Sequence, residues 1–382
     1  MVVNRNEPKT MPFTRRHFLA TTLSSLSLSF MPQVALGGIS PAPKKLKILF
    51  LGGTGYLGPH TVNYAIARGH EVTLFNRGKT NTDLFPMLRK IKGNRDPKID
   101  RGLTHLKSGE WDAVIDTSGF VPRIVNASAS LLADRVKHYL FISTLCVYDQ
   151  WAASGLDNTE NRKLIPFNSQ IGEDVAKHYC ELKAYSENAI NAVMPNRVTN
   201  IRPGFIVGPR DKKNRFYYWP TRIERGGDVI ALGKPNDLTQ FIDVRDLAKF
   251  IIHCLETKLT GDYNLVAPQL SFGHFLNTCN QVTGNKAKLH WIPHEYLAKH
   301  QIYPWQDLPM WAAKNASDAG MVSWSSQKAL DDGLTIRPLE ETIRDTLDWY
   351  HTLSDAERMK LKTSMTDKKE KTALNAWKND NL

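Results

Sequence analysis

Cysteine is scarce in this chain of 382 residues, and the four that occur form no C-x-x-C pair and have no histidines at zinc spacing. Neither a metal site nor a disulfide scaffold is therefore indicated, and we interpret Cys146, Cys180, Cys254 and Cys279 as buried thiols. The chain also lacks internal repeats and low-complexity blocks. With 41% apolar and 23% charged residues, its composition argues against fibrous and disordered classes and is ordinary for a soluble globular enzyme.

Charged residues are missing from a stretch near the N-terminus, between the pair Arg15-Arg16 and Lys44. The stretch ends in small residues, and Ser, Thr and Pro32 interrupt its apolar part, which argues against a stable transmembrane helix. It resembles a twin-arginine export signal. The resemblance predicts a signal peptide over residues 1–37, the export machinery as a partner of the precursor, and a periplasmic or cell-envelope location. The alternative is a tail that contains an arginine pair by chance.

Negative charge is in deficit, because 38 Asp and Glu residues stand against 50 Lys and Arg, a net charge of +12. Such a surplus attracts anions, including phosphates, nucleotides and nucleic acids, through a long-range field. The positive residues are scattered along the chain rather than grouped in one arm, which favours an ordinary solvated basic surface. Charge alone therefore does not predict a nucleic-acid partner.

A glycine-rich turn follows the first strongly apolar segment. The run "KLKILFL" predicts a buried parallel strand, and it leads directly into "GGTGYLG" and the helical pattern "PHTVNYAIARGH". Glycines let the backbone turn tightly and approach a pyrophosphate, whose charge is met by free N–H groups at the helix N-terminus. This order predicts a dinucleotide site. We expect cofactor contacts at six positions of the turn: Gly52, Thr54, Gly55, Tyr56, Leu57 and Gly58.

An acidic residue is missing after the second predicted strand, "EVTLF", where an NAD site often places one for the ribose hydroxyls. The chain has Asn76 and Arg77 there instead, and we expect both to contact the cofactor. Arg77 slightly favours NADP over NAD, because an arginine suits a 2′-phosphate. Otherwise Arg77 is an ordinary surface arginine.

The spacing G-x-x-G-x-x-G resembles the short-chain dehydrogenase/reductase superfamily, in particular its extended or atypical, NAD-dependent epimerase/dehydratase-like members. The resemblance implies an α/β fold with a Rossmann-type, doubly wound parallel sheet and a smaller mixed α/β substrate lobe. We expect three parts after the signal: an NAD(P)-binding domain over 45–210 with 240–257 returning to it, a substrate lobe over 211–239 and 258–354, and a charged C-terminal helix or tail over 355–382.

Polar residues follow two further predicted strands. Thr117 and Ser118 come after "WDAVID", and Ser143 and Thr144 come after "KHYLFI". Ligands of open α/β sheets lie beyond the carboxyl ends of the strands. We therefore expect Thr117 and Ser118 to contact the cofactor, and Ser143 and Thr144 to face the substrate.

A predicted helix, "EDVAKHYCELKAYSENAINAV", carries Tyr179 and Lys183 four residues apart and hence on one face. We expect the ammonium group to favour tyrosinate, which lowers the pKa of the phenol, and to contact the cofactor. Tyr179 would exchange a proton with the substrate, Thr144 would hydrogen-bond the substrate oxygen, and the nicotinamide would exchange hydride. The resemblance assigns the same roles to these positions. The alternative is a helix-surface pair, and we interpret Glu187 as a solvated partner of Lys183 and Tyr148 as a packing residue.

A proline-glycine turn, Arg202-Pro203-Gly204, ends another predicted strand and resembles the "RPG…GP" turn of extended members. Such a turn stops the strand sharply and would let Pro203 pass close to the nicotinamide. The alternative is an ordinary loop at the end of a strand.

Acidic residues are missing directly after Thr144, where sugar-nucleotide dehydratases of the superfamily carry an Asp-Glu pair. Leu145 and Cys146 hold those positions. They cannot supply the extra acid and base that elimination of water needs, so we disfavour 4,6-dehydration and retain epimerisation or reduction. Tyr179 lies 35 residues after Thr144, and we expect the insert 149–172 to form a loop over the site.

Arginine and aromatic residues are interleaved in the stretch 215–225. Together they suit a phosphate beside a flat ring, as in a nucleotide-sugar, or single-stranded RNA. The plainer interpretation is an aromatic core beneath a basic surface helix. On the first interpretation we expect Arg215, Tyr218 and Arg222 to contact the substrate.

These patterns together predict an NAD(P)-dependent epimerase or oxidoreductase that acts on a hydroxyl or ketone of a sugar or nucleotide-sugar. An exported enzyme lacks a soluble cofactor pool, so we expect its NAD(P) to be tightly bound and regenerated within each turnover. Two alternatives are an NADPH-dependent ketone reductase and a non-catalytic protein that binds RNA or another anion. We expect no metal and no nucleic-acid partner, and a homodimer stays open.

Overall fold

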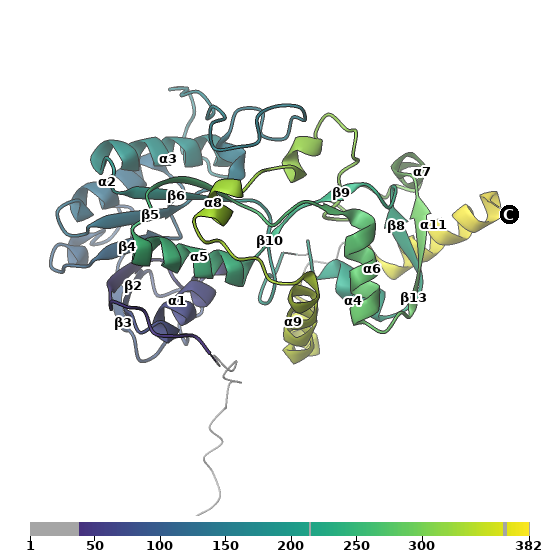
Figure 1. Ribbon diagram of the computed structural model, residues 1–382, viewed down its shortest axis with the longest axis horizontal. Helices are drawn as coiled ribbons and strands as arrows, with labels where there is room; N and C mark the ends of the chain where they lie inside the picture. Colours follow the sequence, from purple (N-terminus) through teal and green to yellow (C-terminus); the bar gives the residue numbers. More distant parts are fainter. Residues whose placement is uncertain (1–37, 214, 362–364, 382) are drawn as a thin grey trace, which may run out of the picture. The chain divides into compact units, whose positions relative to one another are not determined.

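A seven-stranded sheet forms the centre of the fold (Figure 1). The computed structural model describes residues 38–213, 215–361 and 365–381, so the export signal expected at 1–37 lies outside the described residues. The strands follow the order β11-β6-β5-β4-β1-β2-β3, and every neighbouring pair is parallel. Their bounds are β1 Lys47–Leu51, β2 Glu71–Asn76, β3 Arg89–Lys92, β4 Ala113–Asp116, β5 His138–Ile142, β6 Val198–Pro203 and β11 Gly261–Leu265.

Alternate side chains of β1 pack on opposite faces of the sheet, as the pleat of a strand requires. Ile48 and Phe50 join one apolar core with α1 and α5, whereas Leu49 and Leu51 join another with α2 and α3 (Figure 1). Helices on both faces explain why the strands are short, nearly continuous apolar runs. The predicted doubly wound parallel sheet is confirmed. The four covering helices are α1 Leu57–Ala67, α2 Pro122–Leu132, α3 Tyr179–Val193 and α5 Val244–Thr257.

A second apolar core is built around the parallel pair β8 (Gly227–Leu232) and β13 (Ala287–Ile292). Helices that contribute to it are α4 Tyr218–Glu224, α6 Phe272–Val282, α7 His294–Lys299, α9 Leu339–Thr352 and α11 Asp367–Asp380. The remaining elements are β7 Ile206–Val207, β9 Leu238–Thr239, β10 Ile242–Asp243, β12 Leu270–Ser271, η1 Thr104–Leu106, η2 Leu145–Val147, η3 Ala319–Val322, α8 Gln327–Asp331 and α10 Asp355–Arg358.

The C-terminal helix α11 is packed on this second core. Thr366 caps its first turn by accepting a hydrogen bond from the Lys369 backbone N–H. Glu370 is buried and forms a 2.5 Å ion pair with Arg222, and Leu374 joins the apolar core. The charged segment at the chain end therefore helps to hold together the elements around the second apolar core. Within the described residues, we find no helix with both the length and the apolar character that crossing a bilayer requires.

Glu187 lies in the protein interior, which corrects the expectation of a solvated partner for Lys183. Its carboxylate accepts a hydrogen bond from Nη2 of Arg202 at 2.6 Å, and both side chains are almost fully buried. Arg202 also donates to the hydroxyl of Tyr148 at 2.8 Å and to Asp262 at 2.7 Å. The opposite charge comes from the neighbouring strand β6 rather than from the adjacent turn of α3. Tyr148 is a buried packing residue, as predicted.

We predict that Glu187→Ala lowers the free energy of unfolding by about 3–5 kcal/mol, because it leaves a buried guanidinium without its main partner. Denaturant unfolding at neutral pH measures this loss. Asn188→Ala, at the exposed next position of α3, is the matched control and should change stability by no more than about 0.5 kcal/mol. Equal effects of the two substitutions would contradict the structural role of the pair.

Candidate active site

The glycine turn joins β1 to α1 through backbone conformations that side chains resist. Gly52 and Gly53 have φ angles of +110° and +91°, in the region that favours glycine. A Cβ at Gly58 would lie 2.4 Å from the carbonyl carbon of Gly53, whereas a Cβ at Gly55 would meet no atom within 4 Å. Gly58 therefore lets α1 pack against the turn, and Gly55 leaves open space of the kind that a closely approaching pyrophosphate needs.

Two asparagines hold this turn in place. Nδ2 of Asn76, the last residue of β2, donates to the Gly52 carbonyl at 3.3 Å, and Nδ2 of Asn81 donates to the Thr54 carbonyl at 2.7 Å. The role of Asn81 was not predicted, because no local pattern links this residue to a turn 27 residues away. Arg77 is exposed beside Asn76, and the preference for NADP stays a prediction.

The residues around the turn fit a bound NAD. Helix α1 begins after Tyr56 without a side-chain cap, so its first N–H groups are available to an anion, and Leu57 at its start is buried. The Tyr56 hydroxyl is buried and has no hydrogen-bond partner among the described residues. An uncapped helix start, open space at Gly55 and an unpaired buried hydroxyl together form a suitable cradle. These groups would hold the pyrophosphate part of the cofactor.

Alanine substitutions at two glycines separate folding from nucleotide binding. Gly58→Ala should lower the free energy of unfolding by about 1–3 kcal/mol or more, because the added Cβ would overlap the Gly53 backbone. Gly55→Ala should keep parental stability and weaken nucleotide binding, because its methyl group enters only the open space. Thermal unfolding and calorimetric titration with NAD measure the two effects. Parental nucleotide affinity in folded Gly55→Ala would contradict the placement of the cofactor.

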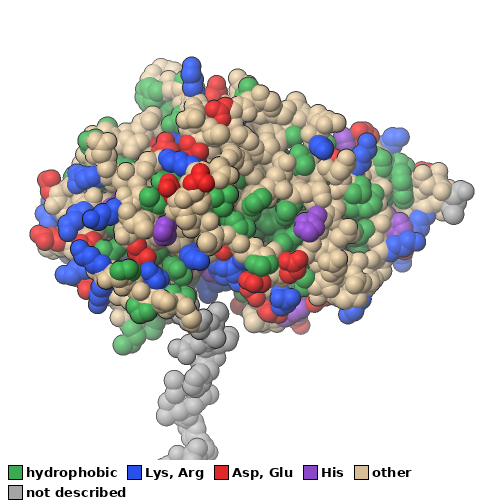
Figure 2. Space-filling model, viewed as in Figure 1, with side chains coloured by type: hydrophobic (Ala, Val, Ile, Leu, Met, Phe, Trp, Pro, Cys, Tyr) green, Lys and Arg blue, Asp and Glu red, His purple; other side chains and the backbone are tan. Residues whose placement is uncertain are grey.

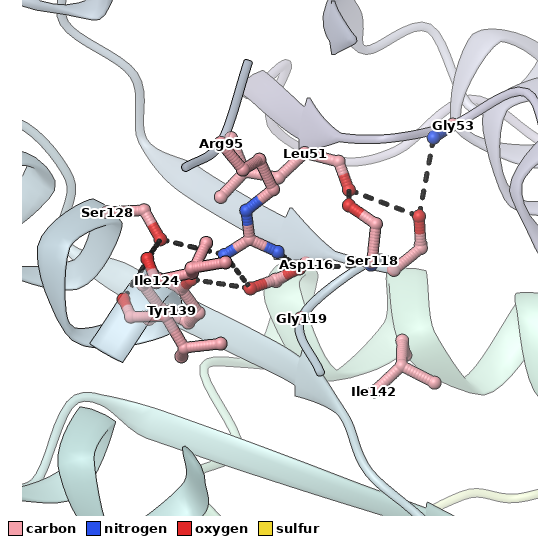
Figure 3. Close-up of polar contacts among 12 residues, drawn as sticks. Leu51, Gly53, Arg95, Asp116, Ser118, Gly119, Ile124, Ser128, Tyr139 and Ile142 are labelled. Carbon is pink, nitrogen blue, oxygen red and sulfur yellow. Dashed lines mark hydrogen bonds and ion pairs between the residues drawn. The ribbon is translucent and has the colours of Figure 1, made fainter. Parts of the chain in front are cut away.

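A buried polar network lies at the carboxyl end of β4 (Figure 3). Arg95 donates to both oxygens of Asp116 at 2.5 and 2.7 Å, and to the hydroxyl of Ser128 at 2.7 Å. The Tyr139 hydroxyl donates to Asp116 at 2.8 Å, and so does the Ser118 backbone N–H at 3.1 Å. This network fixes the chain where it leaves β4. The pairing of Arg95 with Asp116 was not predicted, since no motif joins an arginine after β3 to an aspartate on β4.

Thr117 and Ser118 are thereby held against the glycine turn. Their hydroxyls donate to the Leu51 carbonyl at 3.2 and 2.9 Å, and the Gly53 N–H donates to the Thr117 hydroxyl at 3.3 Å (Figure 3). A Cβ at Gly52 would lie 2.5 Å from the Thr117 hydroxyl. Both residues therefore line the cradle, at the position where the sequence predicts cofactor contacts.

Thr144 and Tyr179 meet near the carboxyl end of β5. Thr144 precedes η2, whose first turn it caps through its hydroxyl, and Tyr179 is the first residue of α3. The predicted helix 173–193 thus begins later than expected, because residues 174–178 form a turn around Asp174. Ser143 is also buried here, and its hydroxyl has no hydrogen-bond partner within the described chain. A substrate oxygen is the kind of group that would satisfy it.

The pKa of Tyr179 is raised by burial, and the Thr144 hydroxyl and the charge of Arg215 act in the opposite direction. This differs from the expectation that Lys183 lowers the phenol's pKa. The tyrosine is 37% exposed and lies beside the Phe120 ring, at 6.3 Å between ring centres. The phenol is therefore accessible, and its direct polar neighbour is Thr144.

Lys183, one helical turn after Tyr179, is buried and bonded to backbone carbonyls. Its Nζ donates to the carbonyl oxygens of Gly119 at 2.7 Å and Ile142 at 2.5 Å, and lies 3.8 Å from the centre of the Phe141 ring. Burial lowers the pKa of Lys183 to about 7. These contacts fix α3 to the ends of β4 and β5, so the lysine positions the helix that carries the phenol.

The buried lysine makes a pH-dependent contribution to stability. Because its pKa is about 7 when folded and near its ordinary 10.5 when unfolded, the unfolded chain binds more protons between these pH values. Its contribution to the free energy of unfolding should therefore rise with pH across this window, by up to about 1.4 kcal/mol per pH unit. The rise should be absent from Lys183→Met. Denaturant unfolding of both proteins at several pH values measures it, and a pH-independent difference between them would contradict the assignment.

Of the three residues of the stretch 215–225 that were expected to contact substrate, Arg215 is the one whose charge acts on the pKa of the Tyr179 phenol. Its guanidinium lies over the Phe205 ring, 5.5 Å from the ring centre, and its Nε is buried without a hydrogen-bond partner among the described residues. Asp211 is buried next to it, and burial raises the pKa of Asp211 to about 6. Arg215 thus has an unsatisfied donor close to the reacting groups.

Tyr218 and Arg222 lie elsewhere, which corrects the expectation of substrate contacts at these positions. Tyr218 packs in the core of the second lobe, and Arg222 is buried in its ion pair with Glu370. The plainer interpretation, an aromatic core, holds for this helix. Pro203 lies at the end of β6, paired with Leu265 of β11, and its approach to a nicotinamide stays a prediction.

Cys146 and Cys180 form a disulfide bond, which corrects the interpretation of all four cysteines as thiols. Their Cα atoms lie 5.3 Å apart across a separation of 34 residues, a normal geometry for such a bond. Cys254 and Cys279 are buried thiols, as expected. Spacing alone could not reveal the bond, because the fold brings the end of β5 and the start of α3 together.

Comparison with known proteins gives a family match over the segment that carries these groups. Residues 114–265 match the model of the NAD dependent epimerase/dehydratase family. Among solved structures, the UDP-glucose 4-epimerase complex with NAD from Thermus thermophilus is 17% identical, with a TM-score of 0.57, over 81% of this chain and 100% of that chain. The central segment of the chain is therefore similar to this family, and the solved structure shares the fold of the chain.

Two plant proteins are also similar to this chain. The chloroplast stem-loop binding protein of 41 kDa b from Arabidopsis thaliana is 22% identical over 77% of this chain and 79% of its own length. The bifunctional pinoresinol-lariciresinol reductase 2 from Linum usitatissimum is 22% identical over 59% of this chain and 67% of its own length. The proteins similar to this chain thus include a stem-loop binding protein and a reductase.

Proposed function

We propose that the chain is an NAD-dependent epimerase or oxidoreductase that acts on a hydroxyl or ketone of a sugar or nucleotide-sugar. One observation carries the proposal: Thr144 and Tyr179 meet beside the strand ends that also form the nucleotide cradle. Lys183 links the two parts, since it bonds to Gly119, two residues after Thr117 in the cradle. A protein that only binds nucleotides has no need of a phenol and a hydroxyl placed in this way.

The described side chains divide the work of such a reaction. NAD supplies the exchange of hydride with the substrate carbon. Thr144 would hydrogen-bond the substrate oxygen and keep it next to the Tyr179 phenol, which would give or take the proton. Arg215, with its unsatisfied Nε, suits a phosphate of the substrate. Lys183 would fix the position of α3, and with it the phenol, relative to the ends of β4 and β5.

Epimerisation rather than dehydration is supported by the groups that follow Thr144. Leu145 is apolar and Cys146 is bound in the disulfide, so neither supplies the extra acid or base of an elimination.

We further propose that the chain is exported by the twin-arginine signal and carries tightly bound NAD(P), with hydride returned within each turnover. Mass spectrometry of nucleotides that co-purify with the exported protein tests this, and a nucleotide-free preparation active only with added NADPH would favour the ketone reductase.

A second candidate function is RNA binding without catalysis, which the similarity to the chloroplast stem-loop binding protein favours. Single-stranded RNA binding needs a positive groove with exposed aromatic platforms. On the face seen in Figure 2, Lys and Arg side chains are interspersed with Asp and Glu. Trp219, in the aromatic stretch that follows Arg215, is fully buried. These observations make the enzyme the better supported candidate.

We predict that Tyr179→Phe lowers turnover of nucleotide-sugars by about 10²–10⁴-fold, because the proton loses its acceptor, while NAD affinity stays parental. Steady-state kinetics and calorimetric titration measure the two quantities. Tyr64→Phe, on α1 at a partly exposed position, is the matched control and should leave both unchanged. Parental turnover in Tyr179→Phe would contradict the role of the phenol, and tight RNA binding by a protein without turnover would favour the second candidate.

A further inference from the structure

We propose that the Cys146–Cys180 disulfide is a positioning element that holds the Thr144 and Tyr179 hydroxyls together. The proposal rests on the proposed function, in which these two groups act on one substrate oxygen. The bond joins η2 at the end of β5 to the first turn of α3. One cysteine lies two residues after Thr144, and the other directly follows Tyr179.

The bond touches the reacting groups as well as their neighbours in sequence. The Thr144 hydroxyl lies 3.6 Å from Sγ of Cys146, to which it donates, and accepts a hydrogen bond from the Cys146 N–H at 3.4 Å. The same hydroxyl acts on the pKa of the Tyr179 phenol. The disulfide therefore links the segment that carries the Thr144 hydroxyl to the helix start that carries the Tyr179 phenol, so that movement at Cys180 is transmitted to both.

Little else fixes the start of α3. Its N-cap residue, His178, makes no side-chain capping hydrogen bond, and a helix start without a cap frays readily. Tyr179 is partly exposed, and its ring contact is with Phe120, itself 42% exposed. Because the first turn lacks a side-chain cap, the cross-link constrains the start of α3 in addition to the anchor that Lys183 provides one turn further along.

Lys183 is held in a different way, which makes the two contributions separable. Its ammonium is buried and bonded to the Gly119 and Ile142 carbonyls, contacts that do not involve either cysteine. Loss of the bond should therefore free the first turn of α3 and leave the second turn and the glycine cradle in place. The expected consequence is a loss of kcat without a loss of nucleotide affinity.

The bond also closes the base of the insert between β5 and α3. Within it, Tyr148 and Leu164 form an isolated antiparallel bridge, and the Ile165 N–H donates to the Val147 carbonyl at 2.8 Å. Residues 164 and 165 of the insert thus lie next to Val147 and Tyr148, close to Cys146, before the chain continues to Tyr179. Forming the bond removes two protons and two electrons from the two thiols, and an oxidised dithiol protein of the export compartment would accept them by thiol–disulfide exchange. The proposed location therefore fits the bond.

The test compares the oxidised protein with Cys146→Ser/Cys180→Ser, assayed well below the unfolding temperature of each. We expect kcat to fall by about 10–100-fold, as misplacement of a reacting group by about 1 Å does, with the NAD dissociation constant unchanged. Reduction by a small dithiol should give the same loss, and reoxidation should reverse it. Cys254→Ala/Cys279→Ala, at the two free buried thiols, is the matched control and should keep parental kcat.

A second readout does not depend on turnover. The ultraviolet absorbance of tyrosinate, taken as the difference between each protein and its Tyr179→Phe counterpart, reports the titration of this one phenol. Without the bond, the pKa of Tyr179 should move toward the ordinary value of a tyrosine. An unchanged titration together with parental kcat in Cys146→Ser/Cys180→Ser would overturn the proposal. If the titration moves although the parent turns over no nucleotide-sugar, the positioning role stands and the proposed function fails.

Discussion

The buried ammonium of Lys183 is the interaction on which the rest of the site depends. Removing a charge from water is costly, and here two backbone carbonyls, of Gly119 and Ile142, and the face of the Phe141 ring offset only part of that cost, since burial still lowers the pKa of Lys183 to about 7. Both carbonyls lie where β4 and β5 end. The lysine therefore ties α3 to the edge of the sheet at which the glycine turn also lies, and the distance between phenol and cradle is set by the sheet itself.

Local patterns were enough to predict the frame of this arrangement. Three features are neighbours in sequence: the apolar run of β1, the glycines from Gly52 to Gly58, and the helix after them. Their order along the chain is therefore enough to predict how they are arranged in space. The i, i+4 relation of Tyr179 and Lys183 is equally local. The direction in which the pKa of the Tyr179 phenol shifts could not be predicted from this pattern. Burial raises that pKa and the Thr144 hydroxyl lowers it, and both effects depend on how β5 and α3 pack.

Three of the wrong predictions concern partners that are distant in the chain. Glu187 pairs with Arg202 of β6 rather than with solvent, and Arg222 pairs with Glu370, which lies 148 residues away. Polar residues carry no periodicity that reveals such partners, whereas apolar residues do. The same limit hid the bond between Cys146 and Cys180. A charged or sulfur-containing residue could be located on an element, but its partner could not be identified before the elements were assembled.

The residue at position 146 affects both the proton-transfer groups of the proposed site and the positions of its hydroxyls. An acid at this position, as in the dehydratases that the sequence resembles, would need freedom to approach the substrate and exchange a proton. A disulfide removes both the proton and the freedom, because Sγ of Cys146 is bonded to Cys180. In the proposed site, the proton-transfer group is then the Tyr179 phenol beside Thr144. The proposed site therefore suits reactions in which hydride and one proton move at a single oxygen-bearing carbon, and disfavours those that need an acid at position 146 to protonate a leaving group.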